Sequence, residues 1–357
     1  MILSARPGAH IAGIATAMPS NRVEPEAVSA TLSEIFPDED PGFIDGLVER
    51  SGVETRYLVP TIEQVLTKST FTERNAVYRT ASANLAFQAS SAALRNAGVK
   101  ADEIDVLIDV SCTGISIPAL DVELAPRLGL RSDVRRIPIT ESGCAAGALA
   151  LGMAGTFAQS GLRVLVVAVE VCTLTLVRED ISRTNLIASL LFGDGAGAMV
   201  ITPGGTGPRI EATASHLIPN TRDAMGFDVG THGMRIQLQR ELPIVLQQNL
   251  VQNVDEFLER HGRSREDVGL HLVHPGGRRI LEAYERLFEL GSGGLTFSRE
   301  ALRRYGNISS VSILTVLELA METDLTQAED KEVLIVGVGP GLSLEFSLLS
   351  IDREMGA

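Results

Sequence analysis

One cysteine stands where an expected strand turns into an expected helix. Cys144 follows a tight turn at Ser142-Gly143, after a strand expected over 136–140. The helix that follows is built from Ala, Gly, Leu and Met on every side, which is typical of a buried helix. Unpaired N–H groups and the macrodipole stabilise an anion at the N-terminal end of such a helix. The pattern therefore predicts a lowered pKa for the Cys144 thiol and a nucleophilic thiolate.

Two polar residues in the second half of the chain complete a set that suits thioester chemistry. His274 ends an expected strand, where open α/β sheets place functional groups, and Gly276 and Gly277 after it let a ligand approach. Asn307 precedes an expected helix. A thiolate would attack an acyl thioester. The His274 Nε2–H and the Asn307 amide would then stabilise the enolate that forms when a malonyl unit loses carbon dioxide.

Each of these residues also has a plain structural interpretation. A free cysteine among Ala and Gly is often an inert core residue. A histidine at the end of a strand is often a hydrogen-bonded core residue, and an asparagine before a helix can act only as its N-cap. On these residues alone, a cysteine hydrolase or a non-catalytic acyl-binding protein stays open.

Composition limits the class of protein. The chain has 357 residues, of which 45% are hydrophobic and 21% charged, so a sizeable core is expected. A net charge of −14 argues against a nucleic-acid partner. Three cysteines (Cys112, Cys144 and Cys172) with no Cys-x-x-Cys pattern predict no disulfide framework and no metal site, and a reducing cytoplasm fits. No apolar run reaches the ~18 residues of a membrane span, and we expect no secretion signal at the start.

The elements that must position these residues alternate between strands and helices. A strand over 163–172 is nearly continuous in apolar and β-branched residues, which is typical of a sheet covered on both faces. A seam is expected at 204–208, and the parts on either side of it are interpreted as two copies of one α/β architecture. The other main expected elements are helices over 73–97, 243–261 and 278–290 and from 308 onward, strands over 105–112, 209–216, 268–274, 333–338 and 342–351, and a hairpin segment over 234–238.

Five short motifs, in this order and at these separations, resemble those of one family. They are Gly-Cys-Ala-Ala-Gly at 143–147, Phe-Gly-Asp-Gly at 192–195, His-Pro-Gly-Gly at 274–277, Gly-Asn-Ile-Ser-Ser at 306–310 and Gly-Val-Gly-Pro-Gly at 337–341. From about residue 11 to 351, the chain resembles the type III polyketide synthases of bacterial type. These form the chalcone synthase-like family within the thiolase superfamily.

The resemblance implies an α/β fold of the thiolase type, with five αβαβα layers and two similar halves. Residues 1–205 would form the half that carries the nucleophile, and residues 206–357 the half that carries His274 and Asn307. It also implies a homodimeric acyltransferase that uses coenzyme A thioesters and no metal or redox cofactor. Cys144 would be loaded with the starter acyl group, and His274 would hold it as a thiolate–imidazolium pair.

The resemblance further assigns substrate-binding residues. Phe192 matches a gatekeeper between the coenzyme A tunnel and the cavity, and Ile236 stands near the second gatekeeper position. Ala188 stands where a small residue opens the elongation pocket. The remaining positions are a cavity position (Cys112), a residue that reaches across the dimer (Ile117), neighbours of the catalytic residues (Ser309, Gly276 and Gly277) and two cations for coenzyme A (Arg50 and Arg279).

An aliphatic cavity of this kind suits a flexible alkyl chain, because each buried CH₂ contributes about 0.8 kcal/mol. We therefore predict a fatty acyl-CoA starter, extension with malonyl-CoA, and cyclisation to an alkylpyrone or alkylresorcinol. The alternatives are a tetrahydroxynaphthalene-forming or chalcone-like synthase, and an enzyme like ketosynthase III that makes one condensation. The Gly-x-Gly-Pro-Gly loop argues against the last of these.

Overall fold

The computed structural model describes residues 8–239, 241–291, 293–323, 325 and 331–351. Nine strands form one sheet. They are β1 (Ala9–Ala17), β4 (Val106–Val110), β5 (Arg135–Ile139), β6 (Val164–Val171), β7 (Asp194–Pro203), β8 (Arg209–Leu217), β11 (Val268–Val273), β12 (Glu332–Gly339) and β13 (Ser343–Ser350).

The strand order is β11-β12-β13-β8-β1-β7-β6-β4-β5. β1 and β8 pair only through Ala9 with Ile210 and His10 with Arg209. The assembly therefore consists of two half-sheets that meet at a short seam. The first half of the chain supplies β1 and β4 to β7, and the second half supplies β8 and β11 to β13. The division into residues 1–205 and 206–357 as folding units stays a prediction.

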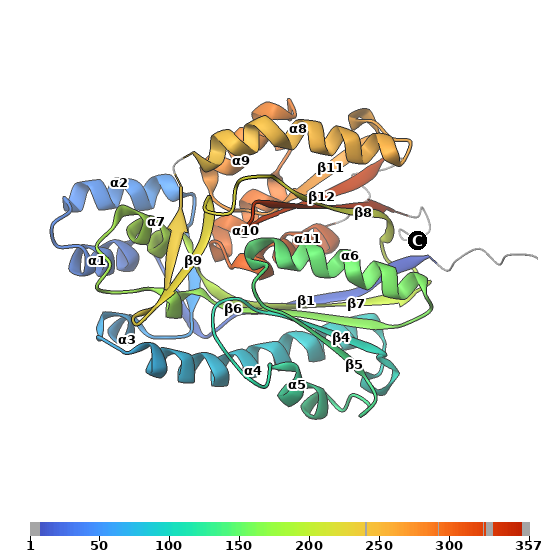
Figure 1. Ribbon diagram of the computed structural model, residues 1–357, viewed down its shortest axis with the longest axis horizontal. Coiled ribbons are helices and arrows are strands. Elements are labelled where there is room, and N and C mark those ends of the chain that lie inside the picture. The colour runs from blue at the N-terminus through green and yellow to red at the C-terminus, as the bar shows by residue number, and fades with distance from the viewer. Residues whose placement is uncertain (1–7, 240, 292, 324, 326–330, 352–357) are drawn as a thin grey trace, which may run out of the picture.

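Helices form three layers around these half-sheets (Figure 1). Two helices lie between the half-sheets, and the others named here cover their outer faces. This arrangement confirms the thiolase-like αβαβα fold expected from the resemblance. The inner helices are α6 (Ala146–Gln159) and α11 (Ser312–Thr323), and the outer ones are α4 (Phe71–Ala97) and α5 (Asp121–Leu128) on one side and α8 (Leu242–Arg260) and α9 (Arg278–Leu287) on the other.

Local sequence accounts for the longest helix. The Thr70 side chain accepts a hydrogen bond from Glu73 N, and the Glu73 carboxylate accepts one from Thr70 N, so the helix begins with a capping box. Gly98 ends it in the left-handed conformation with φ 63°. The sequence prediction of 73–97 was therefore right to within two residues.

Several smaller elements surround one end of the half-sheets. The hairpin of β9 and β10 was expected only in its second strand, because the two glycines of β9 weaken a strand signal. Helices α7 and α10 were not expected. The remaining bounds are α1 (Pro25–Ile35), α2 (Pro41–Ser51), α3 (Ile62–Leu66), α7 (Arg183–Leu191), α10 (Thr296–Tyr305), β2 (Asn21–Val23), β3 (Arg56–Leu58), β9 (Met225–Gly230), β10 (Gly233–Leu238) and the 3-10 turns η1 (Ala101–Glu103), η2 (Gly143–Ala145), η3 (Cys172–Thr175), η4 (Arg265–Asp267) and η5 (Ser309–Val311).

Two glycines let segments from the two halves approach closely. A Cβ on Gly147 of α6 would lie 2.2 Å from the Ser310 carbonyl oxygen. Gly306 has φ 69°, and a Cβ there would lie 2.5 Å from the Leu191 carbonyl oxygen. Because both positions lack a side chain, the segment that carries Asn307 packs against both α6 and the end of α7.

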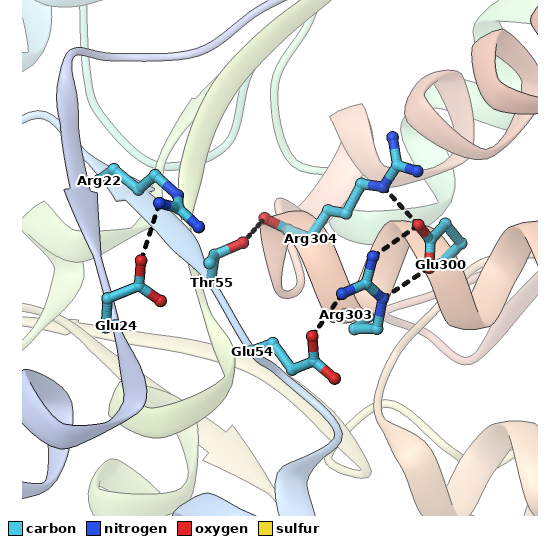
Figure 2. A network of polar contacts seen from close by, with 7 residues as sticks. All are labelled: Arg22, Glu24, Glu54, Thr55, Glu300, Arg303 and Arg304. Atoms are coloured by element: carbon cyan, nitrogen blue, oxygen red, sulfur yellow. Dashed lines mark hydrogen bonds and ion pairs between the residues drawn. The ribbon is translucent and has the colours of Figure 1, made fainter.

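A polar network fixes the end of α10, which leads into Asn307 (Figure 2). Arg303 bonds both Glu54 and Glu300, and the Arg304 Nε lies 2.5 Å from Glu300. The backbone N–H groups of Glu54 and Thr55 donate to the Arg303 carbonyl at 2.8 and 3.0 Å. These exposed ion pairs contribute little individually. Together with the backbone bonds, they hold residues from both halves of the chain in register.

Candidate active site

One cavity of about 550 Å³ brings together the three residues that were expected to do chemistry. Cys144 comes from η2, His274 from the loop after β11, and Asn307 from the loop before η5. His274 and Asn307 are each 4% exposed. Residues far apart in the sequence therefore converge on one space, as a reaction at a single carbonyl group requires.

The Cys144 thiol lies at the turn before α6, as the sequence predicted, but its pKa differs from the expectation. Its Sγ lies 3.5 Å from the Ser309 hydroxyl oxygen. Burial raises the pKa of Cys144 to about 11, while the Ser309 hydroxyl and the backbone N–H of Cys144 act in the opposite direction. The prediction of a lowered pKa was wrong, because loss of hydration outweighs the stabilisation at the helix end.

Alkylation of Cys144 by iodoacetamide should accelerate about tenfold per pH unit from about pH 7 to about pH 9, because only the thiolate reacts. The background variant Cys112→Ala/Cys172→Ala leaves Cys144 as the one thiol. Mass spectrometry of the modified peptide measures the rate. A preformed thiolate–imidazolium pair would instead give a constant rate over that range, and this result would contradict the raised pKa.

His274 is held by its backbone, whose N–H donates to the Val336 carbonyl at 2.9 Å. Its Nδ1 is buried and has no hydrogen-bond partner among the described residues. Burial also lowers the pKa of His274 to about 4, so the ring is neutral near pH 7. An unpaired buried acceptor is less unfavourable than an orphaned N–H group. We therefore assign the ring hydrogen to Nε2, where His274 is a donor toward the cavity.

The amide of Asn307 has one defined orientation. Its Oδ1 accepts a hydrogen bond from Ser309 N at 2.9 Å and another from the Ser312 hydroxyl at 3.3 Å. Both hydrogen bonds are accepted by Oδ1 from residues of the same segment, so the Nδ2 group is left to face the cavity. The amide is thus more than an N-cap: it presents N–H donors beside the donor of His274.

A buried carboxylate lies behind the cavity lining and holds segments of it together. Glu170 is fully buried on β6 and accepts hydrogen bonds from Cys112 N at 3.1 Å, the Thr113 hydroxyl at 2.8 Å and the Ser310 hydroxyl at 2.5 Å. Burial raises its pKa above the usual range. Sequence reasoning missed Glu170 because a single acid within an apolar strand carries no motif.

The Ser309 hydroxyl lies between the thiols of Cys112 and Cys144. Its oxygen lies 3.5 Å from the sulfur of Cys112 and 3.5 Å from that of Cys144. The Ser309 backbone has φ 47°, a conformation that is rare for a residue with a side chain. The Oδ1 of Asn307 holds this strained residue through its backbone N–H.

Phe192 lies at the end of α7 and lines the cavity. Its carbonyl and those of Ser189 and Leu190 accept hydrogen bonds from the fully buried Arg56 guanidinium. Asp194 accepts from Val59 N and from Thr173, and burial raises its pKa to about 6. These bonds fix the backbone that carries the Phe192 ring.

The remaining predicted site residues divide into two groups. Those that line the cavity are Ile236, Cys112, Ala188, Ser309 and Gly276. Those that do not are Gly277, at the N-terminus of α9, Ile117, Arg50 and Arg279. Ile117 is 92% exposed, and both arginines are on the surface. Sequence reasoning missed most of the hairpin residues that line the cavity, namely Met225, Phe227, Val229, Met234 and Leu238.

In the described ranges, no group of three or more His, Cys, Asp or Glu side chains is arranged to hold a metal ion. No helix in that part of the chain has both the length and the apolar character needed to cross a membrane.

Comparisons with known proteins agree on one family. A model described as the N-terminal domain of chalcone and stilbene synthases matches residues 2–208, and its C-terminal counterpart matches residues 209–351. A 1,3,6,8-tetrahydroxynaphthalene synthase of Streptomyces peucetius subsp. caesius is 36% identical over 352 residues, which cover 96% of this chain and 93% of the relative. The α-pyrone synthesis polyketide synthase-like Pks18 of Mycobacterium tuberculosis is 30% identical and covers 96% and 91%.

A solved structure is also similar over nearly its whole length. It is the tetrahydroxynaphthalene synthase of Streptomyces coelicolor A3(2), a bacterial type III polyketide synthase. The TM-score is 0.92 at 32% sequence identity, and the match covers 96% of this chain and 99% of the solved one.

Proposed function

Because the chain belongs to the chalcone and stilbene synthase family and is a type III polyketide synthase, we propose that it loads a fatty acyl group from coenzyme A onto Cys144 and extends it with malonyl-CoA. Cyclisation would give an alkylpyrone or alkylresorcinol. The observation that carries this proposal is a second, apolar cavity that adjoins the first one.

The loading step uses the thiol and a donor in the same cavity. The Cys144 sulfur attacks the thioester carbonyl carbon while the Nε2–H of His274 donates to the carbonyl oxygen, and the carbon–sulfur bond to coenzyme A breaks. The thiol proton is released to water, because the cavity-facing nitrogen of the neutral His274 ring already carries a hydrogen. The departing coenzyme A thiolate takes a proton from water.

The condensation step uses the two donors. When malonyl-CoA loses carbon dioxide, the electron pair of the broken carbon–carbon bond moves into the thioester, and an enolate forms. His274 Nε2–H and Asn307 Nδ2–H donate to the enolate oxygen. The enolate carbon attacks the acyl carbon on Cys144, and the thiolate leaves. The orientation of the Asn307 amide, set by Ser309 and Ser312, supports this role.

The adjoining cavity, of about 60 Å³, lies between α1, α3 and α7. It shares five lining residues with the main cavity, which supports the proposal that an acyl chain extends from one to the other. Its other walls are mostly aliphatic, from Val28 and Leu32 to Ile62 and Val65. The shared residues are Cys172, Thr175, Ala188, Phe192 and Ile236.

A second candidate is favoured by the relatives. The tetrahydroxynaphthalene synthase of Streptomyces peucetius is more similar to this chain than Pks18 is. A synthase of that kind would use malonyl-CoA as starter and would not need the adjoining cavity. Radiolabelled malonyl-CoA with a panel of short to long acyl-CoAs distinguishes the two functions. A product from malonyl-CoA alone, unchanged by any fatty acyl-CoA, would overturn the proposed starter.

Ala188→Leu should reduce kcat/KM for long acyl starters about tenfold or more, and leave short starters nearly unchanged. Ala188 lines both cavities, so the larger side chain obstructs the passage. A starter that loses two or three buried CH₂ groups loses about 2 kcal/mol. Competition between hexanoyl- and dodecanoyl-CoA measures the effect. Ile187→Leu on the same helix is the matched control, because Ile187 lines only the main cavity. Equal losses for both starters would contradict the assignment of the passage.

The exposed loop between β4 and α5 supports a homodimer. Ile117 is 92% exposed and Ile115 is 45% exposed, while two hydrogen bonds of 2.8 Å between Asn75 and the Ile115 backbone fix the loop. We expect light scattering to give about twice the 38.1 kDa of one chain, and we expect Ile117→Arg to shift the protein toward that single mass. A dimer unaffected by Ile117→Arg would remove Ile117 from the interface.

A further inference from the structure

One positively charged side chain at the rim of the catalytic cavity has no role in the steps described above. Arg222 is the only Lys or Arg among the described residues that line this cavity. The two arginines assigned to coenzyme A by resemblance, Arg50 and Arg279, do not line it. The Arg50 guanidinium instead folds back toward Gly46, where a Cβ would lie 2.8 Å from Nη1.

The loop that carries Arg222 is fixed from two sides. Ile218 N donates to the Leu342 carbonyl at 2.8 Å, and Leu342 N donates to the Thr221 hydroxyl. On the other side, Gln239 N donates to the Ala224 carbonyl at 2.9 Å. Arg222 is therefore presented by a backbone anchored to the Gly-x-Gly-Pro-Gly loop and to the end of the β9–β10 hairpin.

No described residue forms a hydrogen bond or ion pair with the Arg222 guanidinium. Its situation differs from that of Arg278 and Arg303, which are paired with acids. Among the described residues that line the same cavity, the one carboxylate is that of Glu141, which accepts a hydrogen bond from the Thr140 hydroxyl. An exposed, unpaired guanidinium at the mouth of an apolar cavity fits an anionic group that remains in water.

We propose that Arg222 binds a phosphate at the nucleotide end of the coenzyme A thioester. This inference rests on the proposed function. The carboxylate of malonyl-CoA must react beside His274 and Asn307, which are buried, whereas the phosphates stay hydrated at the rim, where Arg222 is exposed. The chain carries a net charge of −14, so a polyanionic substrate needs a local cation to approach.

The test compares two thioesters of the same acyl group. Malonyl-CoA carries the nucleotide, and malonyl-N-acetylcysteamine lacks it. Arg222→Ala should raise KM for malonyl-CoA on the order of fivefold, since one exposed charged contact contributes that much. It should leave KM for malonyl-N-acetylcysteamine and kcat unchanged. Arg222→Lys should retain part of the affinity for malonyl-CoA, because it keeps the charge but loses the planar fork.

Arg95→Ala is the matched control, because Arg95 is an exposed arginine in the last turn of α4, outside the cavity lining. It should change neither KM. An equal rise in KM for both thioesters with Arg222→Ala would assign the contact to the malonyl carboxylate and overturn the proposal. No change for either thioester would also overturn it. If the unmodified protein consumed neither thioester, the proposed function itself would fail, which separates the two hypotheses.

Discussion

Replacing Asn307 by aspartate should abolish malonyl-CoA decarboxylation while starter loading on Cys144 continues. The carboxylate keeps an oxygen for the hydrogen bonds from Ser309 N and Ser312, so the loop stays in place. It replaces the Nδ2 donors with a second oxygen, which repels the enolate oxygen instead of stabilising it. Loss of one donor of this type costs a factor of about 10²–10³, and the added negative charge increases the loss.

Two measurements separate the steps in this variant. Release of ¹⁴CO₂ from carboxyl-labelled malonyl-CoA reports decarboxylation, and mass spectrometry of the intact protein reports the acyl group on Cys144. Asn307→Ala removes the oxygen as well, so Ser309 N and the Ser312 hydroxyl lose their acceptor and the melting temperature should fall. Decarboxylation at the unmodified rate in Asn307→Asp would show that the amide only caps the segment from Ser309 onward.

Cys144→Ala should have the reciprocal effect. Removal of the nucleophile eliminates the covalent intermediate, so polyketide formation should fall by at least about three orders of magnitude. The donors on His274 and Asn307 do not depend on the sulfur, so slow decarboxylation of malonyl-CoA should persist. The released two-carbon unit would appear as acetyl-CoA rather than as a longer chain.

The matched control for this variant is Cys172→Ala. Cys172 is a buried thiol that also lines the cavity, but it comes from η3 and neither approaches Ser309 nor follows the nucleophile turn. Its loss should leave the amount of product within about twofold of the unmodified protein. Product formation by Cys144→Ala at more than a few per cent would show that another group carries the acyl chain.

The residues that define the reaction were recognisable in the sequence because the backbone around them requires glycine at nearby positions. The turn at Gly143 before Cys144 and the glycines that flank His274 and Asn307 are short, local signals. Parts of the surrounding scaffold were also predictable, since β6 is almost wholly apolar and α4 has apolar residues at helical spacing before Gly98. With the family resemblance, these signals fixed the layered fold.

The electrostatic state of the site was not predictable in this way. The expected lowering of the Cys144 pKa came from a local helix-end argument, whereas burial, which depends on the whole fold, has the larger effect. Glu170 and Arg56 likewise gain their importance from partners more than fifty residues away. The cavity walls contributed by β9 depend on where a weakly predicted hairpin packs, and Arg222 carries no motif of its own.

The seam between β1 and β8 has a consequence for biosynthesis. The reactive thiol leaves the ribosome well before the imidazole and the carboxamide, and these two groups reach the thiol only when the second half-sheet has joined the first through β8. A nascent chain that ends before residue 307 lacks the carboxamide of the site. Product formation can therefore serve as a reporter of completed folding.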